Sequence, residues 1–362
     1  MKILQISHGY NAPFLGVSNH YESMLNETNE VVTLYLTGNG SGEVEQATKA
    51  SKVIFWGCDS KQLKGMKLGL IVKLYKLIEH EKFDLVICHR YKAIYLATMV
   101  CLLGLSFKRV GVIHAFGAFQ SLGRRLLLSL DAKSLTILGV SNAIRDNIRD
   151  TMPLFPRNNV QTLYNALDIR EIERGQLARD AAKDFLRLPK ETFIIGNVGR
   201  LHNDKDQATL IKAFAFFNKK VPASQLVIIG SGQLKEPLQE LTNDLGLEEK
   251  VIFLGQIKNA AKYYKAFDLF ALASVKEAFG LVLLEAMAAK VPIVSSNCSG
   301  AKEVVTGAGW LFDFGDVDKL ADIMFRVYLG EKEELVNIAF KRLQEQFSIT
   351  ATSQEFASII ES

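Results

Sequence analysis

Residues 269–295, LFALASVKEAFGLVLLEAMAAKVPIVS, predict the fold class of the whole chain. The apolar runs at 269–272 and 292–295 have the length and composition of buried strands. Between them, a loop at 274–276 leads into a helical segment at 281–289, which ends before the following proline. A strand, a helix and a second strand in this order build a parallel sheet, whose ligands bind beyond the carboxyl ends of its strands.

The same alternation of strand-like runs and helical patterns extends along most of the chain. Its length of 362 residues exceeds what one hydrophobic core usually supports, so two domains are expected. A polar break at 175–189, rich in Arg, Asp and Lys, is the expected linker region. We therefore place an N-terminal α/β domain at 1–170 and a C-terminal one at 171–344. The further predicted strands are residues 3–7, 31–35, 85–88, 110–114, 135–140, 193–198, 225–229 and 251–254.

The composition is that of an ordinary soluble α/β protein, with 48% hydrophobic and 23% charged residues. The first residues form a strand that is too short to be a signal peptide. The apolar run at 93–107 is too short to span a bilayer and predicts a buried helix. Four widely spaced cysteines lack histidines at zinc-binding spacing, so we expect reduced thiols in a cytoplasmic chain. They are Cys58, Cys88, Cys101 and Cys298.

Positive charge is concentrated in the N-terminal half. Residues 1–180 contain 22 Lys and Arg against 16 Asp and Glu, whereas residues 181–362 contain 21 against 23. Between residues 61 and 77, lysines alternate with apolar residues in the pattern of a basic amphipathic helix. Such a helix either presents a solvated face or contacts anionic lipid at a membrane surface. We expect no nucleic-acid partner. The lysines are Lys61, Lys64, Lys67, Lys73 and Lys76.

Two acids in the quoted stretch, Glu277 and Glu285, lie eight positions apart, one in the loop and one about two turns into the helix. Eight helical residues span roughly 12 Å. The paired acids of glycosidases lie closer, at about 5 to 9.5 Å. The two acids are therefore suited to holding the two ends of one elongated ligand, with free amides at the helix start binding an anion between them. The alternative is two solvated helix acids without a binding role.

This Glu-x7-Glu pattern resembles that of the retaining glycosyltransferases of the family 4 type, the glycosyl transferases group 1. The resemblance implies the GT-B fold, in which two facing Rossmann-like α/β domains enclose a cleft. It also implies that the domain at 1–170 is on the acceptor side, with the C-terminal helix, here 345–362, packed back on it. The domain at 171–344 would bind the nucleotide-sugar donor. Glu277 would approach the donor sugar, and Glu285 would bind the ribose hydroxyls. The amides that hold the diphosphate would be those of Phe279, Gly280 and Leu281.

Further strand ends carry residues suited to the donor. One strand ends in Gly199 and Arg200, and Lys205 follows before the next helical pattern. Glycine lets the backbone approach a ligand closely, while Arg and Lys supply cations for a diphosphate. In the family this segment binds the diphosphate, so the resemblance gives these three residues that role. By the same resemblance, Gly230 lies in a nucleotide-binding turn and Gln256 is a candidate for contact with the base.

The N-terminal domain contributes fewer recognisable residues. The family often has paired glycines near the donor phosphates in the first loop, and here the loop at 9–16 offers Gly16. His114, at the end of a predicted strand, is interpreted either as a hydrogen-bonded core histidine or as a catalytic residue beside the donor sugar. Asn165 resembles the family's segment that enters the interdomain connection.

The resemblance implies a retaining transferase that moves a sugar from a nucleotide-diphosphate donor, with a UDP-sugar favoured over a GDP-sugar, to a hydroxyl of a glycan or glycolipid. The expected pathway is cell-surface polysaccharide or lipopolysaccharide synthesis, and the expected location is the cytoplasm, at the inner face of the membrane. No Asp-x-Asp pair is found where Mg²⁺ would be expected, so we predict a metal-independent enzyme without a cofactor. The candidate catalytic residues are Glu277, Arg200, Lys205 and His114.

Two alternatives use the same donor-binding residues: a non-catalytic nucleotide-sugar-binding subunit and a GT-B sugar-nucleotide epimerase. An NAD-linked oxidoreductase is poorly supported, because no strand opens on a full Gly-x-Gly-x-x-Gly with a suitably spaced acid.

Overall fold

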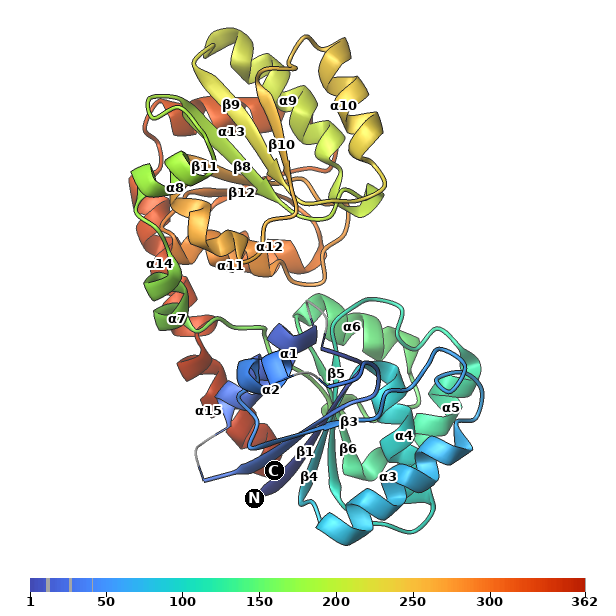
Figure 1. Cartoon of the computed structure of the whole chain (residues 1–362). Helices are drawn as coiled ribbons and strands as arrows, with labels where there is room; N and C mark the ends of the chain where they lie inside the picture. Colours follow the sequence, from blue (N-terminus) through green and yellow to red (C-terminus); the bar gives the residue numbers. More distant parts are fainter. Residues whose placement is uncertain (11–13, 26–27, 41, 362) are drawn as a thin grey trace. The chain divides into compact units, whose positions relative to one another are not determined.

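The computed structural model describes residues 1–10, 14–25, 28–40 and 42–361. The chain forms two compact units (Figure 1). The first comprises Met1–Tyr164 and Thr352–Ser362, and the second comprises Asn165–Ala351. The domain boundaries expected from the sequence were residues 170 and 344.

The first unit ends at Tyr164 because the segment that follows is paired within the second unit. The amide of Leu167 donates to the carbonyl of Phe347 at 2.8 Å, and the amide of Ile349 donates to the carbonyl of Leu167 at 3.1 Å. Asn165, which the sequence placed at the interdomain connection, is the first residue of the second unit.

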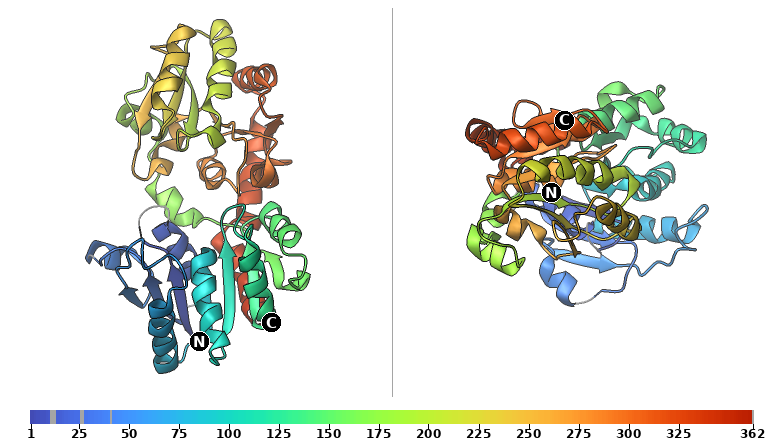
Figure 2. Two further views of the ribbon diagram at one scale, coloured as in Figure 1. Left: turned by 90° about the vertical axis from the view of Figure 1, so that its right-hand side faces the viewer. Right: turned by 90° about the horizontal axis from the view of Figure 1, so that it is seen from above.

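The first unit is built on a seven-stranded parallel sheet in the order β3-β2-β1-β4-β5-β6-β7. The strand order reverses between β1 and β4, which pair with each other. The central strands are buried along nearly their whole length, as expected of parallel strands with helices on both faces (Figures 1 and 2). The strands are β1 (Lys2–Ser7), β2 (Glu30–Tyr35), β3 (Lys52–Phe55), β4 (Leu85–His89), β5 (Lys108–Ile113), β6 (Leu135–Gly139) and β7 (Val160–Thr162).

The C-terminal helix α15 (Ile349–Glu361) contributes its last part to the first unit. The ring of Phe356 packs edge-on against Tyr21 at 5.5 Å, and the carbonyl of Ile360 accepts a hydrogen bond from Lys108 Nζ at 2.8 Å. The other helices of this unit are α1 (Phe14–Met24), α2 (Gly42–Ala47), α3 (Leu68–Glu81), α4 (Arg90–Leu102), α5 (Leu122–Leu130) and α6 (Asn142–Thr151).

The second unit has a six-stranded parallel sheet in the order β10-β9-β8-β11-β12-β13. Here the strand order reverses between β8 and β11, which pair with each other. Side chains from α9, α13 and the sheet, among them Phe214, Met324 and Ile228, form its buried core. The strands are β8 (Phe193–Val198), β9 (Ser224–Ile229), β10 (Val251–Gly255), β11 (Leu269–Leu272), β12 (Ile293–Ser296) and β13 (Trp310–Phe312). The helices are α7 (Ile169–Gly175), α8 (Arg179–Phe185), α9 (Gln207–Lys220), α10 (Lys235–Asp244), α11 (Leu281–Ala288), α12 (Ser299–Val305), α13 (Val317–Tyr328) and α14 (Glu333–Gln346).

All ten predicted strands are confirmed, and three others were missed. The missed strands, β3, β7 and β13, lie at sheet edges and contain only three or four residues. An edge strand is paired on one side only, so its residues need not form the long apolar run that marks a central strand.

The linker predicted at 175–189 is wrong, because this polar stretch is packed into the second unit. It contains α8, whose residue Lys183 is fully buried and donates hydrogen bonds to the carbonyls of Lys190 and Thr192 at 2.6 and 2.9 Å. Phe185 stacks on Tyr263 with ring centroids 4.3 Å apart. Apart from Lys183, the charged residues of this stretch are exposed.

The basic amphipathic helix predicted from residue 61 begins only at Leu68. Gly65 and Lys67 have positive φ angles of 62° and 55°, a conformation that cannot continue a right-handed helix, so Lys61 and Lys64 lie in turns before α3. The apolar run at 93–107 forms most of α4 and is largely buried, as predicted. Among the described residues, no helix is long and apolar enough to cross a membrane.

Candidate active site

The loops at the carboxyl ends of β8 and β11 lie where the strand order of the second sheet reverses, the usual position of a ligand site in an open parallel sheet. Lys205 follows β8 in a short 3₁₀ turn, and Glu277 follows β11. Lys205 Nζ donates to Glu277 Oε2, and both side chains are about 16% exposed. The two loops are also joined by the amide of Val275, which donates to the carbonyl of Asp204 at 2.9 Å. The sequence predicted both charged residues for one site, and the structure brings them together.

Neighbouring residues hold the Glu277 loop in place. Ser274 Oγ donates to Glu277 Oε2 at 3.3 Å, and Ser296 Oγ, at the end of β12, donates to the carbonyl of Ser274 at 2.5 Å. The amide of Gly300 donates to the carbonyl of Glu277 at 2.9 Å. The contacts of Ser296 and Gly300 tie the loop after β11 to the segment that follows β12.

The helix predicted after Glu277 is confirmed as α11, with Gly280 at its N-cap. Gly280 has φ 101°, a conformation that side chains other than glycine rarely adopt. Phe279 is buried with its ring edge-on to Phe347 at 5.6 Å, so its side chain is covered by the protein. Leu281 is 36% exposed at the first helical position. The amide of Leu283 donates to the carbonyl of Gly280 at 2.9 Å. The positive end of the helix dipole at this helix start favours an anion.

Glu285 is the fifth residue of α11, about one turn from the start of the helix. Tyr264 Oη donates to Glu285 Oε2 at 2.8 Å, and the Tyr264 ring is fully buried against Phe270. Burial raises the pKa of Glu285 to about 7, an effect that the hydrogen bond from Tyr264 partly offsets. Tyr264 lies 21 positions before its partner and was not identified from the sequence.

The turns after β8 and β9 are in close contact. Gly230 has φ 150°, and a Cβ there would lie 1.9 Å from the carbonyl oxygen of Gly199, so this position requires glycine. Arg200 is exposed, and its carbonyl accepts a hydrogen bond from Gln207 Nε2 at 3.0 Å. Gln256 is exposed just beyond β10, one strand further from the ion pair than Gly230.

His114 lies in the first unit, where it belongs to a hydrogen-bonded chain of polar residues. Its Nε2 is 3.2 Å from His89 Nδ1, and His89 Nε2 is 3.0 Å from Gln5 Oε1. Gln5 Nε2 lies 2.9 Å from Glu22 Oε1, which also accepts from Thr33 Oγ1 at 2.6 Å. Only His114 of this chain was predicted from the sequence.

The hydrogen-bonded chain fixes the proton positions of both histidines. Because the Gln5 amide donates to Glu22, its oxygen is the acceptor for His89 Nε2–H. His89 Nδ1 then carries no proton and accepts from His114 Nε2–H. Burial lowers the pKa of His114 to about 3 and that of His89 well below its usual value, so both rings are neutral. His114 Nδ1 is therefore an acceptor, and no described residue pairs with it.

The prediction that Gly16 lies in the first loop is wrong. Gly16 is the third residue of α1 and is exposed on that helix. Residues 11–13 of the predicted loop lie outside the described residues. Among the described residues, no three of His, Cys, Asp and Glu lie close enough together to hold a metal ion.

Comparison with known proteins matches both parts of the chain. Residues 178–342 match the family described as "Glycosyl transferases group 1", and residues 16–171 match "Glycosyltransferase Family 4". The chain is 28% identical over 312 residues to N-acetyl-alpha-D-glucosaminyl L-malate synthase of Bacillus anthracis, covering 79% of this chain and 80% of that protein. It is 33% identical over 252 residues to an N-acetylgalactosaminyltransferase of Campylobacter jejuni named for a diphospho-undecaprenol substrate, covering 67% of this chain and 66% of that protein.

Solved structures share the fold over the whole chain. A glycosyltransferase from Rickettsia africae superposes with a TM-score of 0.83 at 15% identity, covering 99% of this chain and 97% of that one. HepE from Anabaena in complex with UDP gives a TM-score of 0.81 at 20% identity, covering all of both chains. Taken with the two family matches, these likenesses show that the chain is a glycosyltransferase of the family 4 type with the two-domain GT-B fold.

Proposed function

We propose that this enzyme transfers a sugar, with retention of configuration, from a nucleoside-diphosphate donor to a hydroxyl of a glycan or lipid-linked acceptor. The observation that carries the proposal is the placement of Lys205, Glu277 and the start of α11 at the point where the second sheet reverses its strand order. A cation, a carboxylate and a helix N-terminus at one place suit a sugar diphosphate. The favoured donor is a UDP-sugar, and a relative from Escherichia coli is named for UDP-Gal.

The roles of the second unit follow from its chemistry. Arg200 and Lys205 are the cations for the diphosphate, together with the amides of Phe279, Gly280 and Leu281. Glu277 is positioned by Lys205 and Ser274 to accept hydrogen bonds from the donor sugar. Glu285, further along α11, accepts from the ribose hydroxyls when it is ionised.

In the proposed reaction the bond between the anomeric carbon and the leaving diphosphate oxygen breaks. The acceptor hydroxyl oxygen forms its bond to the same carbon on the same face, and its proton passes to a leaving phosphate oxygen. Preorganised cations and amides stabilise the charge that develops on the diphosphate, which is typically a term of several kcal/mol. In the first unit, His114 Nδ1 is an acceptor suited to a hydroxyl of the donor sugar.

The acceptor is proposed to lie at a membrane surface. The Campylobacter and Escherichia relatives are both named for diphospho-undecaprenol substrates, which are lipid-linked. In the first unit, Leu122, Leu126 and Leu130 form an exposed row along α5, with exposures of 66, 52 and 73%, and Arg124 and Arg125 lie on the same helix. Such a combination of apolar and basic side chains favours the surface of an anionic bilayer. The expected location is the inner face of the cell membrane, in cell-surface glycan synthesis.

The proposal is tested by following sugar transfer from UDP-sugars to a diphosphate-linked lipid acceptor by NMR, in buffer that contains EDTA. We expect release of UDP and a product with the donor's anomeric configuration. Because no metal is required in the proposed reaction, the rate in EDTA should match the rate with Mg²⁺ or Mn²⁺. An inverted product would contradict retention, and activity that returns only with Mn²⁺ would contradict metal independence. Isomerisation of the donor without an acceptor would instead favour an epimerase.

A further inference from the structure

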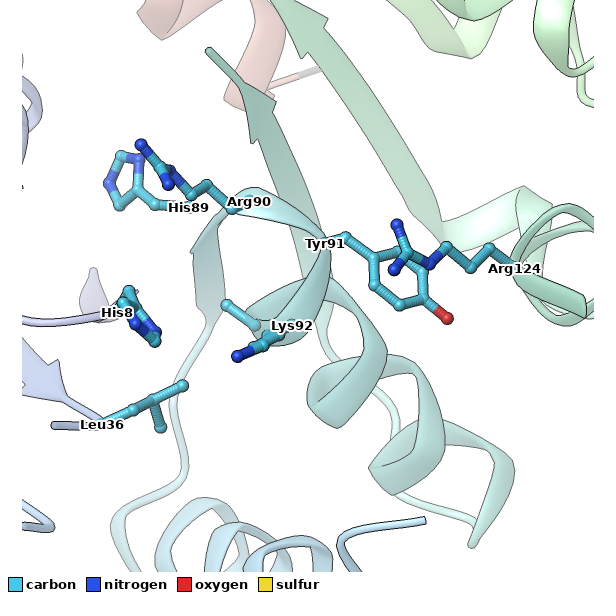
Figure 3. A pocket seen from close by; sticks show the side chains of 8 residues that line it. His8, Leu36, His89, Arg90, Tyr91, Lys92 and Arg124 are labelled. Atoms are coloured by element: carbon cyan, nitrogen blue, oxygen red, sulfur yellow. The ribbon is translucent and has the colours of Figure 1, made fainter. Parts of the chain in front are cut away.

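A second candidate binding site lies in the first unit, where its own sheet reverses its strand order between β1 and β4. A pocket of about 230 Å³ opens there, beside the carboxyl ends of both strands (Figure 3). Buried Leu36 lines one side of the pocket, and the first turn of α4 lines another side. The groups proposed above to bind the donor diphosphate, Lys205 and the start of α11, belong to the other unit.

The pocket is strongly basic. His8, Arg90, Lys92 and Arg124 line it, and no Asp or Glu is found among its described lining residues. The charges of Lys92 and Arg90 add to burial in lowering the pKa of His8, and the charges of Lys92 and Arg124 add to burial in lowering that of nearby Lys67. Lys92 and Arg124 therefore add positive charge to the same place in the fold. An anion bound among them would offset this charge.

The backbone favours the same ligand. The pocket receives the N-terminus of α4, a helix of 13 residues whose first-turn amides carry partial positive charge. Arg90, the first helical residue, has φ 67°, a conformation that is uncommon for a residue other than glycine and often marks a functional site. This conformation orients the start of α4 at the end of β4, next to His89 of the hydrogen-bonded histidine chain.

Arg124 is held at the pocket from a different helix. Its guanidinium stacks on the Tyr91 ring, 4.4 Å from the ring centroid (Figure 3). The same guanidinium donates to the carbonyl of Ala118 at 2.8 Å. Stacking leaves the remaining N–H groups of Arg124 free for a planar anion such as a phosphate. Neither Lys92 nor Arg124 forms an ion pair within the described part of the chain. Arg124 lies on α5, the helix with the exposed leucine row.

We propose that this basic pocket, formed by His8, Arg90, Lys92 and Arg124, binds the phosphate or diphosphate group of the acceptor. The inference rests on the proposed function and extends it, because it assigns an anionic acceptor to residues of the first unit. A diphosphate that carries a lipid would place its charged group in the pocket and its apolar chain toward the exposed leucines of α5.

The experiment is an isothermal titration of inorganic pyrophosphate and of farnesyl diphosphate into the enzyme, with UDP held at saturation so that the donor site is occupied. Three proteins are compared: wild type, Lys92→Glu in the pocket, and Lys76→Glu at an exposed position of α3. The two substitutions change the net charge by the same amount. We expect Lys92→Glu to raise the Kd of both diphosphates at least tenfold. Lys76→Glu should change either Kd less than twofold. Thermal unfolding of each variant shows whether it is folded.

Equal affinities in the two variants, or no binding of either probe, would overturn the proposal. Binding of pyrophosphate without binding of farnesyl diphosphate would overturn the assignment to a lipid acceptor. The UDP titration that precedes each experiment reports separately on the donor site. A protein that binds diphosphate through Lys92 but does not bind UDP would refute the proposed function and leave the pocket assignment intact.

Discussion

The two acids of the Glu-x7-Glu pattern differ in their surroundings. Glu277 is paired with Lys205 and accepts a hydrogen bond from Ser274. Glu285 is half-buried and accepts a hydrogen bond from Tyr264, and loss of solvation raises its pKa to about 7. The sequence predicted both acids and their spacing. It could not predict their different electrostatics, because Tyr264 and Ser274 become partners only in the folded chain.

The raised pKa of Glu285 predicts that UDP binding depends on pH. A carboxylate accepts hydrogen bonds from ribose hydroxyls, whereas the protonated form loses part of that capacity. If only the ionised form binds well, the Kd for UDP should be roughly tenfold higher at pH 6 than at pH 8 for a pKa of about 7. Titration calorimetry across this range tests the prediction. A Kd independent of pH in wild type would contradict the role of Glu285.

Two variants serve as controls for this pH dependence. Glu285→Gln cannot ionise, so its Kd for UDP should not vary between pH 6 and 8. Tyr264→Phe removes the hydrogen bond that lowers the pKa of Glu285. In this variant the change in the Kd for UDP should therefore occur at higher pH. The same shift affects stability: a carboxyl group with a raised pKa in the fold contributes stability that is lost as pH rises from about 4.5 to 7. Glu285→Gln should therefore be more stable than wild type at pH 8.

At the scale of elements, the sequence predicted central strands and α11 well, since long apolar runs and a proline mark them. It failed where conformation depends on single residues or on tertiary packing. The start of α3 was misplaced because left-handed Gly65 and Lys67 interrupt a periodic pattern. The stretch containing α8 was taken for a linker because its buried Lys183 looks like a surface charge in the sequence.

The packing of α12 against the Glu277 loop leads to a prediction about Gly300. A Cβ at this position would lie 2.2 Å from the carbonyl oxygen of Ala278, so alanine must displace the loop that carries Glu277. We expect Gly300→Ala to reduce the turnover number at least tenfold, because misplaced groups lose catalytic geometry. Gly175→Ala is the matched control, since a Cβ there meets only the end of Lys262 at 4.0 Å. Steady-state kinetics that leave the two variants equal would show that this packing does not position Glu277.

At the scale of the whole molecule, the first unit carries the excess of positive charge and the exposed leucine row of α5. Membrane contact through α5 predicts that Leu126→Glu reduces cosedimentation with anionic vesicles at low salt. Leu154→Glu, at a more exposed leucine of the same unit outside α5, should bind the vesicles as wild type does. Loss of binding in both variants, or in neither, would exclude α5 as the contact. The sequence located the basic half of the chain but not this helix, because the exposure of its leucines follows from packing.

The central element of the proposed function is a nucleoside-diphosphate site at Lys205. Charge-assisted hydrogen bonds contribute about 1.5–3 kcal/mol, so Lys205→Ala should weaken UDP binding roughly 10- to 100-fold in EDTA. Lys212→Ala, at an exposed lysine of α9 in the same unit, should bind UDP as tightly as wild type. The decisive measurement is the Kd for UDP of these three proteins by titration calorimetry. A large loss confined to Lys205→Ala is the predicted result, and equal affinity in all three would contradict the proposed donor site.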